Sequence, residues 1–208
     1  MIDRPMRPLF PEDFRNEVQV VNTVLSVDTD NSPEMTALFG SSLATSISKI
    51  PFNGPVAAVK VGRVNGEFII NPTPAELEVS DIDLTVAGTI DAVNMVESGS
   101  KEVSEDDMLE AIMFGHEAIK ELINFANTII SEIGKEKMSY EVLDIETDLR
   151  NEIEAMAKAP MLDAIKIFDK LERAEAVSNL KEEVVKHYED ANVGIDDLEL
   201  TTLLTKVR

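Results

Sequence analysis

The sequence predicts an α+β protein, in which a partial α/β sandwich is followed by an all-helical domain. Three observations lead to this fold class. The pair Asn65-Gly66 lies between two runs rich in β-branched residues, which is the strongest short-range signal for a β-hairpin. Apolar residues with helical spacing follow over 108–133, and after Tyr140 only helical patterns remain. The expected domains span residues 1–134 and 135–208.

Composition limits the possible classes of function. Hydrophobic residues make up 44% of the 208 positions and aromatic residues only 5%, so the core is expected to be aliphatic. Cysteine is absent, which excludes disulfides and thiolate sites and is typical of a cytoplasmic protein. No signal peptide pattern is present, and no apolar run approaches the roughly 18 residues of a membrane span. We therefore expect a cytoplasmic protein without membrane contact.

Negative charge is distributed unevenly along the chain. The formal net charge is −21, of which residues 1–72 contribute −2 and the remaining residues −19. An acidic surface repels phosphate backbones and does not steer the protein toward nucleic acid. Any contact with nucleic acid must therefore come from local basic groups or from parts outside this sequence.

The chain opens with two arginines, Arg4 and Arg7, among closely spaced prolines. Proline fixes φ and removes a backbone donor, so we expect a stiff, extended loop rather than a helix. Such a loop presents two guanidinium groups, which bind phosphate through bidentate contacts. Since loops normally connect elements and nothing precedes this one, we expect the chain to begin in the middle of a domain.

The next elements alternate between strand and helix. Residues 18–27 are rich in valine and predict a strand. Ser32 and Pro33 form a helix start, and the helix is expected to run to about Ser48 with many small side chains that allow close packing on a sheet. The remaining expected elements are the hairpin strands 56–64 and 67–71, a short helix at 74–79, and strands at 83–89 and 92–97 with a bend at Gly88.

The second half of the sequence is helical. Ser104 can cap a long helix that ends at Gly134, and Asp107 can return the capping bond. A further helix is expected over 144–157, and Pro160 is expected to start another with an apolar face that extends to Tyr188 and to stop at residues 192–194. A last helix is expected over 195–208.

Six strings occur in an order and spacing that resemble bacterial polynucleotide phosphorylase: IDRPMRPLFP (2–11), IPFNGP (50–55), VGR (61–63), NPT (71–73), DLTVAGT (83–89) and MFGHE (113–117). The resemblance covers essentially the whole chain. It implies the later half of the first RNase-PH-like domain, without its N-terminal strands, and then the helical domain that joins the two RNase-PH-like domains. The chain is therefore expected to be a fragment, natural or engineered, of a longer enzyme.

The resemblance also implies an activity for the longer protein. The family degrades RNA, including mRNA, from the 3′ end with inorganic phosphate and releases nucleoside diphosphates, and Mg²⁺ is implied for the full-length enzyme. The carboxylates and the lysine of the active second domain align here with Leu77, Asp83 and Thr85, and only the aspartate is kept. The Ser-rich phosphate loop appears as residues 30–33, where Asp30 repels phosphate. We expect this portion to be non-catalytic, with structural and assembly roles, no catalytic or metal-binding residues and no cofactor.

Implied partners are RNA, through the full-length protein, two further copies in a homotrimer, and proteins of RNA-degradation complexes. Arg4 and Arg7 are the candidate RNA- or phosphate-binding residues, because the matching family segment lies near the RNA path. The competing interpretation is that both arginines pair with acids and hold the loop in place. An alternative function of a different class is a free-standing acidic protein-interaction module that has no role in RNA metabolism.

Four other features invite a functional interpretation. Asp81 and Asp83 have the spacing of a metal pair, but no third ligand is near in sequence, so solvated carboxylates at a strand edge are favoured. His116 is expected to pack or cap rather than catalyse, because it has no partner at ligand spacing. His187 is expected near a helix end, where a cation is favoured. The apolar stripe over 161–188 is expected to form core.

Overall fold

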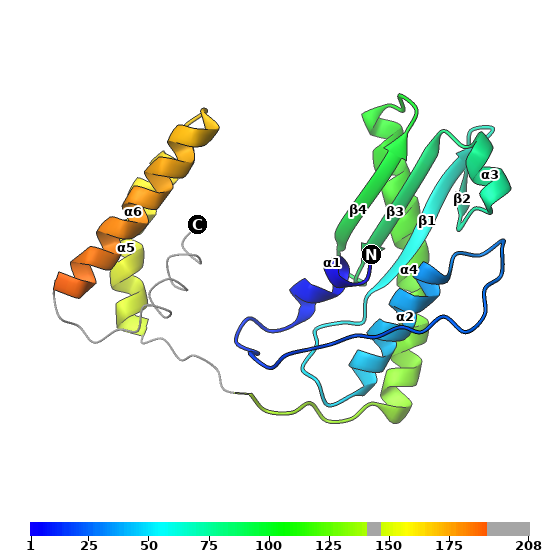
Figure 1. Cartoon of the computed structure of the whole chain (residues 1–208), viewed down its shortest axis with the longest axis horizontal. Helices are drawn as coiled ribbons and strands as arrows, with labels where there is room; N and C mark the ends of the chain where they lie inside the picture. The colour runs from blue at the N-terminus through cyan, green and yellow to red at the C-terminus, as the bar shows by residue number, and fades with distance from the viewer. Residues whose placement is uncertain (141–146, 191–208) are drawn as a thin grey trace. The chain divides into compact units, whose positions relative to one another are not determined.

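The computed structural model describes residues 1–140 and 147–190. The chain divides into two compact units, Met1–Glu141 and Val142–Arg208, and each is described by itself. The first unit carries a four-stranded sheet with helices, and the described part of the second is a pair of helices (Figure 1). The α+β class predicted from the sequence is confirmed.

The segment that opens the chain is helical, so the expectation of an extended loop was wrong. α1 spans Asp3–Met6 and is followed by the 3₁₀ turn η1, Arg7–Leu9. Pro5 and Pro8 each lie in the first turn of their helix, where a backbone N–H has no intrahelical acceptor and its loss costs nothing. The sequence argument treated proline as a helix breaker at positions where it is compatible with a helix start.

Residues 17–28 are extended, but they pair with no strand among the described residues. The valine-rich pattern predicted a strand, and that prediction was wrong. A strand also needs a neighbour that satisfies its backbone groups, and the described chain supplies none. The segment is held by a hydrogen bond from the Ser41 hydroxyl to Asn22 Oδ1 (3.0 Å), and Leu25 is left 91% exposed.

The sheet is antiparallel, with the order β2-β1-β3-β4. Its strands are β1 (Ala57–Val64), β2 (Glu67–Ile70), β3 (Ile82–Gly88) and β4 (Val93–Ser100). Asn65 and Gly66 have φ values of 53° and 83°, which are the left-handed values that the two-residue turn requires, so the predicted hairpin is confirmed. In β1, Val61 faces Ile70 of β2 and Leu84 of β3 across the ladders.

Both faces of the sheet are covered. One face packs against α4, Glu105–Ile133, whose buried Ala111, Ile119 and Ile123 meet the inward-facing valines of β1 and β3. The other face packs with Met6 of α1 and Leu38 of α2, Pro33–Ile47. The predicted helix starts are confirmed, because the Ser32 hydroxyl accepts from Glu34 N and the Ser104 hydroxyl accepts from Asp107 N.

The short helix α3, Pro74–Val79, is also present and begins with a capping box between Thr73 and Glu76. α4 has 29 residues and is therefore about 43 Å long. Gly134 ends it in an extended conformation, with its N–H bonded to the Ile130 carbonyl at 2.8 Å. A Cβ at this position would lie 2.4 Å from that carbonyl oxygen, so the close approach requires glycine.

The second unit differs from the prediction in where its helices break. α5 spans Thr147–Ala164 and α6 spans Lys170–Asp190. Pro160 lies inside α5, so the predicted helix start at Pro160 was wrong. The break falls at residues 165–169, because the Asp169 carboxylate accepts from Leu171 N (2.8 Å) and Glu172 N (3.0 Å) and so starts a new helix. The expected start at Asp144, the stop at 192–194 and the helix at 195–208 lie outside the described residues.

The apolar stripe of the second unit is only partly core. Met161, Val184 and Tyr188 are buried, and Ile153 and Ala157 of α5 complete the contact between the two helices. Phe168 and Leu171, which the stripe placed in the core, are exposed, because the break at 165–169 directs them away from the α5–α6 contact. In the part of the chain that is described, no helix is both long and apolar enough to cross a membrane.

Candidate functional site

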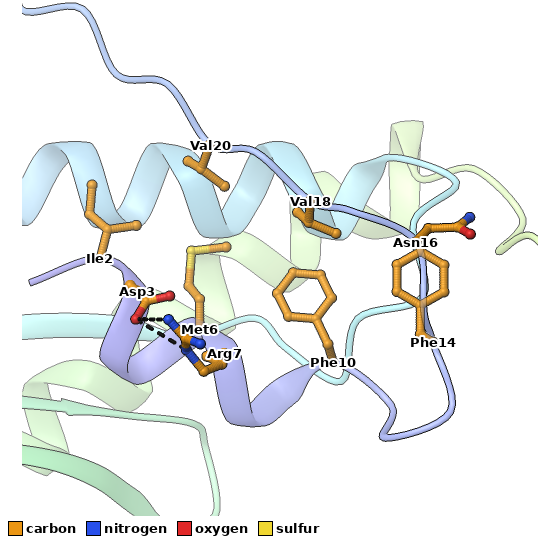
Figure 2. A pocket seen from close by; sticks show the side chains of 9 residues that line it. All are labelled: Ile2, Asp3, Met6, Arg7, Phe10, Phe14, Asn16, Val18 and Val20. Carbon is orange, nitrogen blue, oxygen red and sulfur yellow. Dashed lines mark hydrogen bonds and ion pairs between the residues drawn. The ribbon is translucent and has the colours of Figure 1, made fainter. Parts of the chain in front are cut away.

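The α1–η1 turn borders a cavity of about 560 Å³. The extended segment runs beside the turn and directs Val18 and Val20 toward Phe10 and Met6 (Figure 2). Most of the lining is apolar, and Asp3 and Arg7 supply charge at its edge. The sequence predicted none of the apolar lining residues, because the cavity exists only when the extended segment lies beside the turn.

Arg7 is held by one carboxylate at the edge of the cavity. Its Nε and Nη2 lie 3.1 and 2.6 Å from Asp3 Oδ2, and the hydrogen bond raises the pKa of Arg7 (Figure 2). The two residues are four apart on one helical turn, which places their side chains together. Both side chains are exposed, so the pair contributes little to stability and its guanidinium can still meet a second anion.

Arg4 points to a different partner. Its Nη1 lies 2.8 Å from Glu97 Oε2 on β4, and both side chains are exposed. The structure therefore gives each arginine a single acidic partner, as in the interpretation that ion pairs hold this segment in place. The two guanidinium groups are not brought together on a shared acceptor, although both remain accessible to solvent.

The positions aligned with the catalytic triplet do not form a metal site. Asp83 lies beside Lys60, whose Nζ is 3.5 Å from Asp83 Oδ1, while Leu77 lies in α3 and the Thr85 side chain is buried in the sheet. Across residues 1–140 and 147–190 there is no group of three or more His, Cys, Asp or Glu side chains that could hold a metal ion. A divalent ion at the three aligned positions would meet only the Asp83 carboxylate, which already lies beside the Lys60 ammonium group.

Asp81 belongs to an ion-pair network rather than to a metal pair with Asp83. The Arg63 side chain is only 16% exposed and bonds Asp81 at 2.6 Å and Asp107 at 3.1 Å. The Arg63 guanidinium lowers the pKa of the Asp81 carboxyl, and Ser104 and then Arg63 lower the pKa of Asp107. The network joins β1, the residue that precedes β3 and the first turn of α4.

His116 has a packing role, as predicted. It is buried on α4, and its Nε2 lies 3.0 Å from the Thr89 carbonyl oxygen, so that the ring N–H connects the helix to the turn after β3.

Lys137 also connects distant parts of the first unit, and the sequence did not suggest this contact. Its Nζ donates to the carbonyls of Thr45, Ser46 and Ser48 at 3.3, 2.7 and 2.9 Å, and burial lowers the pKa of Lys137. An ammonium at the end of α2 satisfies carbonyls that have no partner within the helix.

Two family models match the chain. Residues 54–118 match "3′ exoribonuclease family, domain 2", and residues 148–208 match "Polyribonucleotide nucleotidyltransferase, RNA binding domain". Polyribonucleotide nucleotidyltransferase of Streptococcus gordonii is 56% identical over 91% of this chain and 26% of its own length. The enzyme of the same name from Bacillus anthracis is 51% identical over 100% of this chain and 29% of its own length.

A comparison with the crystal structure of rice (Oryza sativa) Rrp46 aligns 50% of this chain with 51% of the Rrp46 chain, with a TM-score of 0.45 and 20% sequence identity. The chain spans a little over a quarter of the length of the curated relatives. The two family models follow the order that the resemblance implied: the first covers the sheet and the first half of α4, and the second covers residues of the helical unit. This chain belongs to the polyribonucleotide nucleotidyltransferase family.

Proposed function

We propose that this chain is the non-catalytic, RNA-contacting portion of a phosphate-dependent 3′-to-5′ exoribonuclease that degrades mRNA to nucleoside diphosphates. The observation that carries the proposal is the 51% identity, over all 208 residues, to a relative named polyribonucleotide nucleotidyltransferase. In this proposal the sheet domain and the helical unit serve assembly and RNA guidance, and the longer protein works in the cytoplasm as a homotrimer, in contact with other RNA-degrading proteins.

The chemistry of phosphorolysis supports placing catalysis elsewhere. Attack of phosphate on the terminal phosphodiester needs cationic groups around the attacking anion and a metal ion that stabilises charge on the reacting oxygens. The aligned positions supply Leu77 and Thr85, which hold neither charge nor metal, and Asp83, which lies beside Lys60. Mg²⁺ is assigned to the longer protein, and the residues described here do not fit it.

Arg4 and Arg7 are the proposed RNA contacts of the first unit. Both side chains are more than half exposed, and each has one carboxylate partner that an RNA phosphate can replace at small cost, because exposed ion pairs are weak. The apolar wall beside Arg7, formed by Phe10, Val18 and Val20, offers a surface for the less polar parts of a nucleotide.

The experiment measures the affinity of the 208-residue chain for a short single-stranded RNA as a function of salt. Replacing Arg4 and Arg7 together by alanine is expected to weaken binding and to reduce the slope of log affinity against log salt by up to about 1.4, because each phosphate contact to a single strand contributes roughly 0.7. Arg15→Ala is the matched control, since Arg15 is also exposed but lies outside the turn. Unchanged affinity and slope in the double variant would reject the contact.

A further inference from the structure

The most exposed aromatic ring of the described chain lies in the second unit. Phe168, in the turn between α5 and α6, is 100% exposed. The seven other phenylalanines each lie against another aromatic ring, in the pairs Phe10–Phe52, Phe14–Tyr140, Phe39–Phe125 and Phe68–Phe114. Among the described residues no ring contact accounts for Phe168, so the sequence places a large apolar side chain in solvent at a helix junction.

The backbone that carries Phe168 is firmly held. Arg173 Nη1 donates to the carbonyls of Ile167 (2.8 Å) and Phe168 (3.0 Å), and the Asp169 carboxylate caps α6 immediately after the ring. The N–H of Ile167 also bonds the Ala164 carbonyl at the end of α5 (3.2 Å). A ring on a fixed turn loses little conformational entropy when it binds, which favours recognition by stacking.

Cationic side chains flank the ring in a chain that is otherwise strongly acidic. Lys166 and Lys170 lie two residues to either side of Phe168, both exposed, and the stretch 166–173 has a net charge of +1 against −21 for the whole chain. Of the nearby acids, Asp169 is committed to the cap, Asp163 pairs with Lys166 at 3.2 Å, and Glu172 follows in the first turn of α6. Both side chains of the Asp163–Lys166 pair are largely exposed, and solvent screens their attraction, so Lys166 can exchange Asp163 for a phosphate at small cost.

We propose that the α5–α6 turn is a contact for single-stranded RNA, in which Phe168 stacks on one base and Lys166 and Lys170 bind the adjacent phosphates. An exposed aromatic ring between cations is the arrangement that binds single strands without sequence preference, because every base has a face on which to stack. The inference rests on the proposed function for its partner, RNA, and adds the residues that would contact it.

Fluorescence anisotropy of a labelled oligoadenylate of about twelve nucleotides, at about 50 mM salt, tests the contact. Phe168→Ala is expected to weaken RNA binding by the 208-residue chain at least about fivefold, which is the affinity loss expected when the weakest kind of base–aromatic stacking contact is removed. Phe168→Tyr keeps an aromatic ring and is expected to bind RNA with unchanged affinity. Leu171→Ala is the matched control, because Leu171 is a nearby apolar side chain that is 78% exposed but not aromatic. Replacing Lys166 and Lys170 by alanine should lower the salt slope by about 1.4.

A second readout is independent of affinity. The chain contains no tryptophan, so Phe168→Trp introduces a single reporter at the proposed stacking position. Its emission is expected to be quenched when RNA is added. Because the Phe168 side chain is fully exposed, the variants at position 168 should keep the helical circular dichroism of the unchanged chain.

Two results would overturn the inference alone: full affinity in Phe168→Ala, or an equal loss in Leu171→Ala, which would indicate a non-aromatic apolar surface such as a protein contact. Absence of RNA binding by the 208-residue chain would overturn the inference together with the proposed RNA contacts of Arg4 and Arg7. The proposed function fails by a different result, namely absence of phosphate-dependent RNA degradation by the longer gene product. The two failures are therefore distinguishable.

Discussion

Gly115 is a point of close approach between α4 and the sheet, and its replacement by alanine gives a quantitative test of the packing. A Cβ built at Gly115 would lie 2.9 Å from Val61 Cγ2 and 3.4 Å from a methyl group of both Val59 and Val86. Val61 is completely buried, and its branched side chain has few alternative rotamers, so it cannot yield easily. Overpacking of this kind costs about 1–3 kcal/mol.

The same substitution also brings a gain. Alanine is favoured over glycine inside a helix by about 1 kcal/mol, so Gly115→Ala is expected to destabilise the first unit by a net amount of roughly 1 kcal/mol. Gly40 in α2 provides the control, because a Cβ there meets nothing within 4 Å. Gly40→Ala is expected to stabilise the same unit by up to about 1 kcal/mol, so the two variants should differ by about 2 kcal/mol.

Hydrogen exchange followed by mass spectrometry resolves this difference within the first unit. Peptides that cover β1 report the free energy of opening of the sheet, and about 2 kcal/mol corresponds to roughly a thirtyfold difference in exchange rate between the two variants. The packing account is refuted if Gly115→Ala slows exchange in β1 as much as Gly40→Ala does, because the sheet would then have room for the added methyl group.

Three further predictions concern single contacts. Lys137→Met removes three hydrogen bonds to the end of α2 and should speed hydrogen exchange there by the equivalent of about 1 kcal/mol. Lys135→Met is the control and should leave exchange in α2 unchanged, because Lys135 bonds the Ile47 carbonyl through its backbone N–H, which the substitution keeps. Asp169→Ala should destabilise α6 by about 1 kcal/mol through loss of its cap, seen as faster exchange in the first turn of α6, while Asp163→Ala should change it by a few tenths at most. Asp81 and Asp107 have folded pKa values below the ordinary 3.8, so their contribution to stability is complete above that pH and is lost as the pH falls through the lowered values. Arg63→Met removes a cause of both shifts, so the urea midpoint should fall less steeply with pH below about 4 in that variant, and an unchanged slope would contradict the role of Arg63.

Local signals predicted much of the first unit. The Asn-Gly pair predicted the hairpin, because few residue types adopt φ above zero at both turn positions. The serine caps predicted the starts of α2 and α4. The glycine stop of α4 follows the same logic, whereas the short helix α3 was predicted without its capping box. These features depend on neighbours within four residues, so the sequence contains all the information they need.

The errors arose where position within an element or a distant neighbour decides the outcome. Pro5 and Pro8 are tolerated because they fall in the first turn of their helices, whereas Pro160 lies inside α5. The break before α6 carried a local signal that was overlooked, since Asp169 is followed three residues later by Glu172, a spacing typical of a helix start. Residues 17–28 have the pattern of a strand, but pairing requires a partner that no local pattern supplies.

The candidate sites divide in the same way. Arg4 and Arg7 were chosen from their side-chain type, their proline-rich context and the family resemblance. Glu97, the partner of Arg4, could not be foreseen, because it lies more than ninety residues away, and the Arg7–Asp3 pair was missed because a loop was expected in place of the helical turn. Phe168 was assigned to the core by its spacing, and its exposure follows from the position of the α5–α6 break. Sequence patterns therefore located the charged candidates, and only the fold revealed which aromatic ring is free to contact a ligand.

Phosphorolysis by the purified 208-residue chain is the most direct test of the claim that these residues contact RNA without carrying out the chemistry. The chain is incubated with end-labelled single-stranded RNA, inorganic phosphate and Mg²⁺, and the products are separated to detect nucleoside diphosphates. The account predicts that RNA is bound and keeps its full length. Phosphate-dependent shortening from the 3′ end, with release of nucleoside diphosphates, would contradict it.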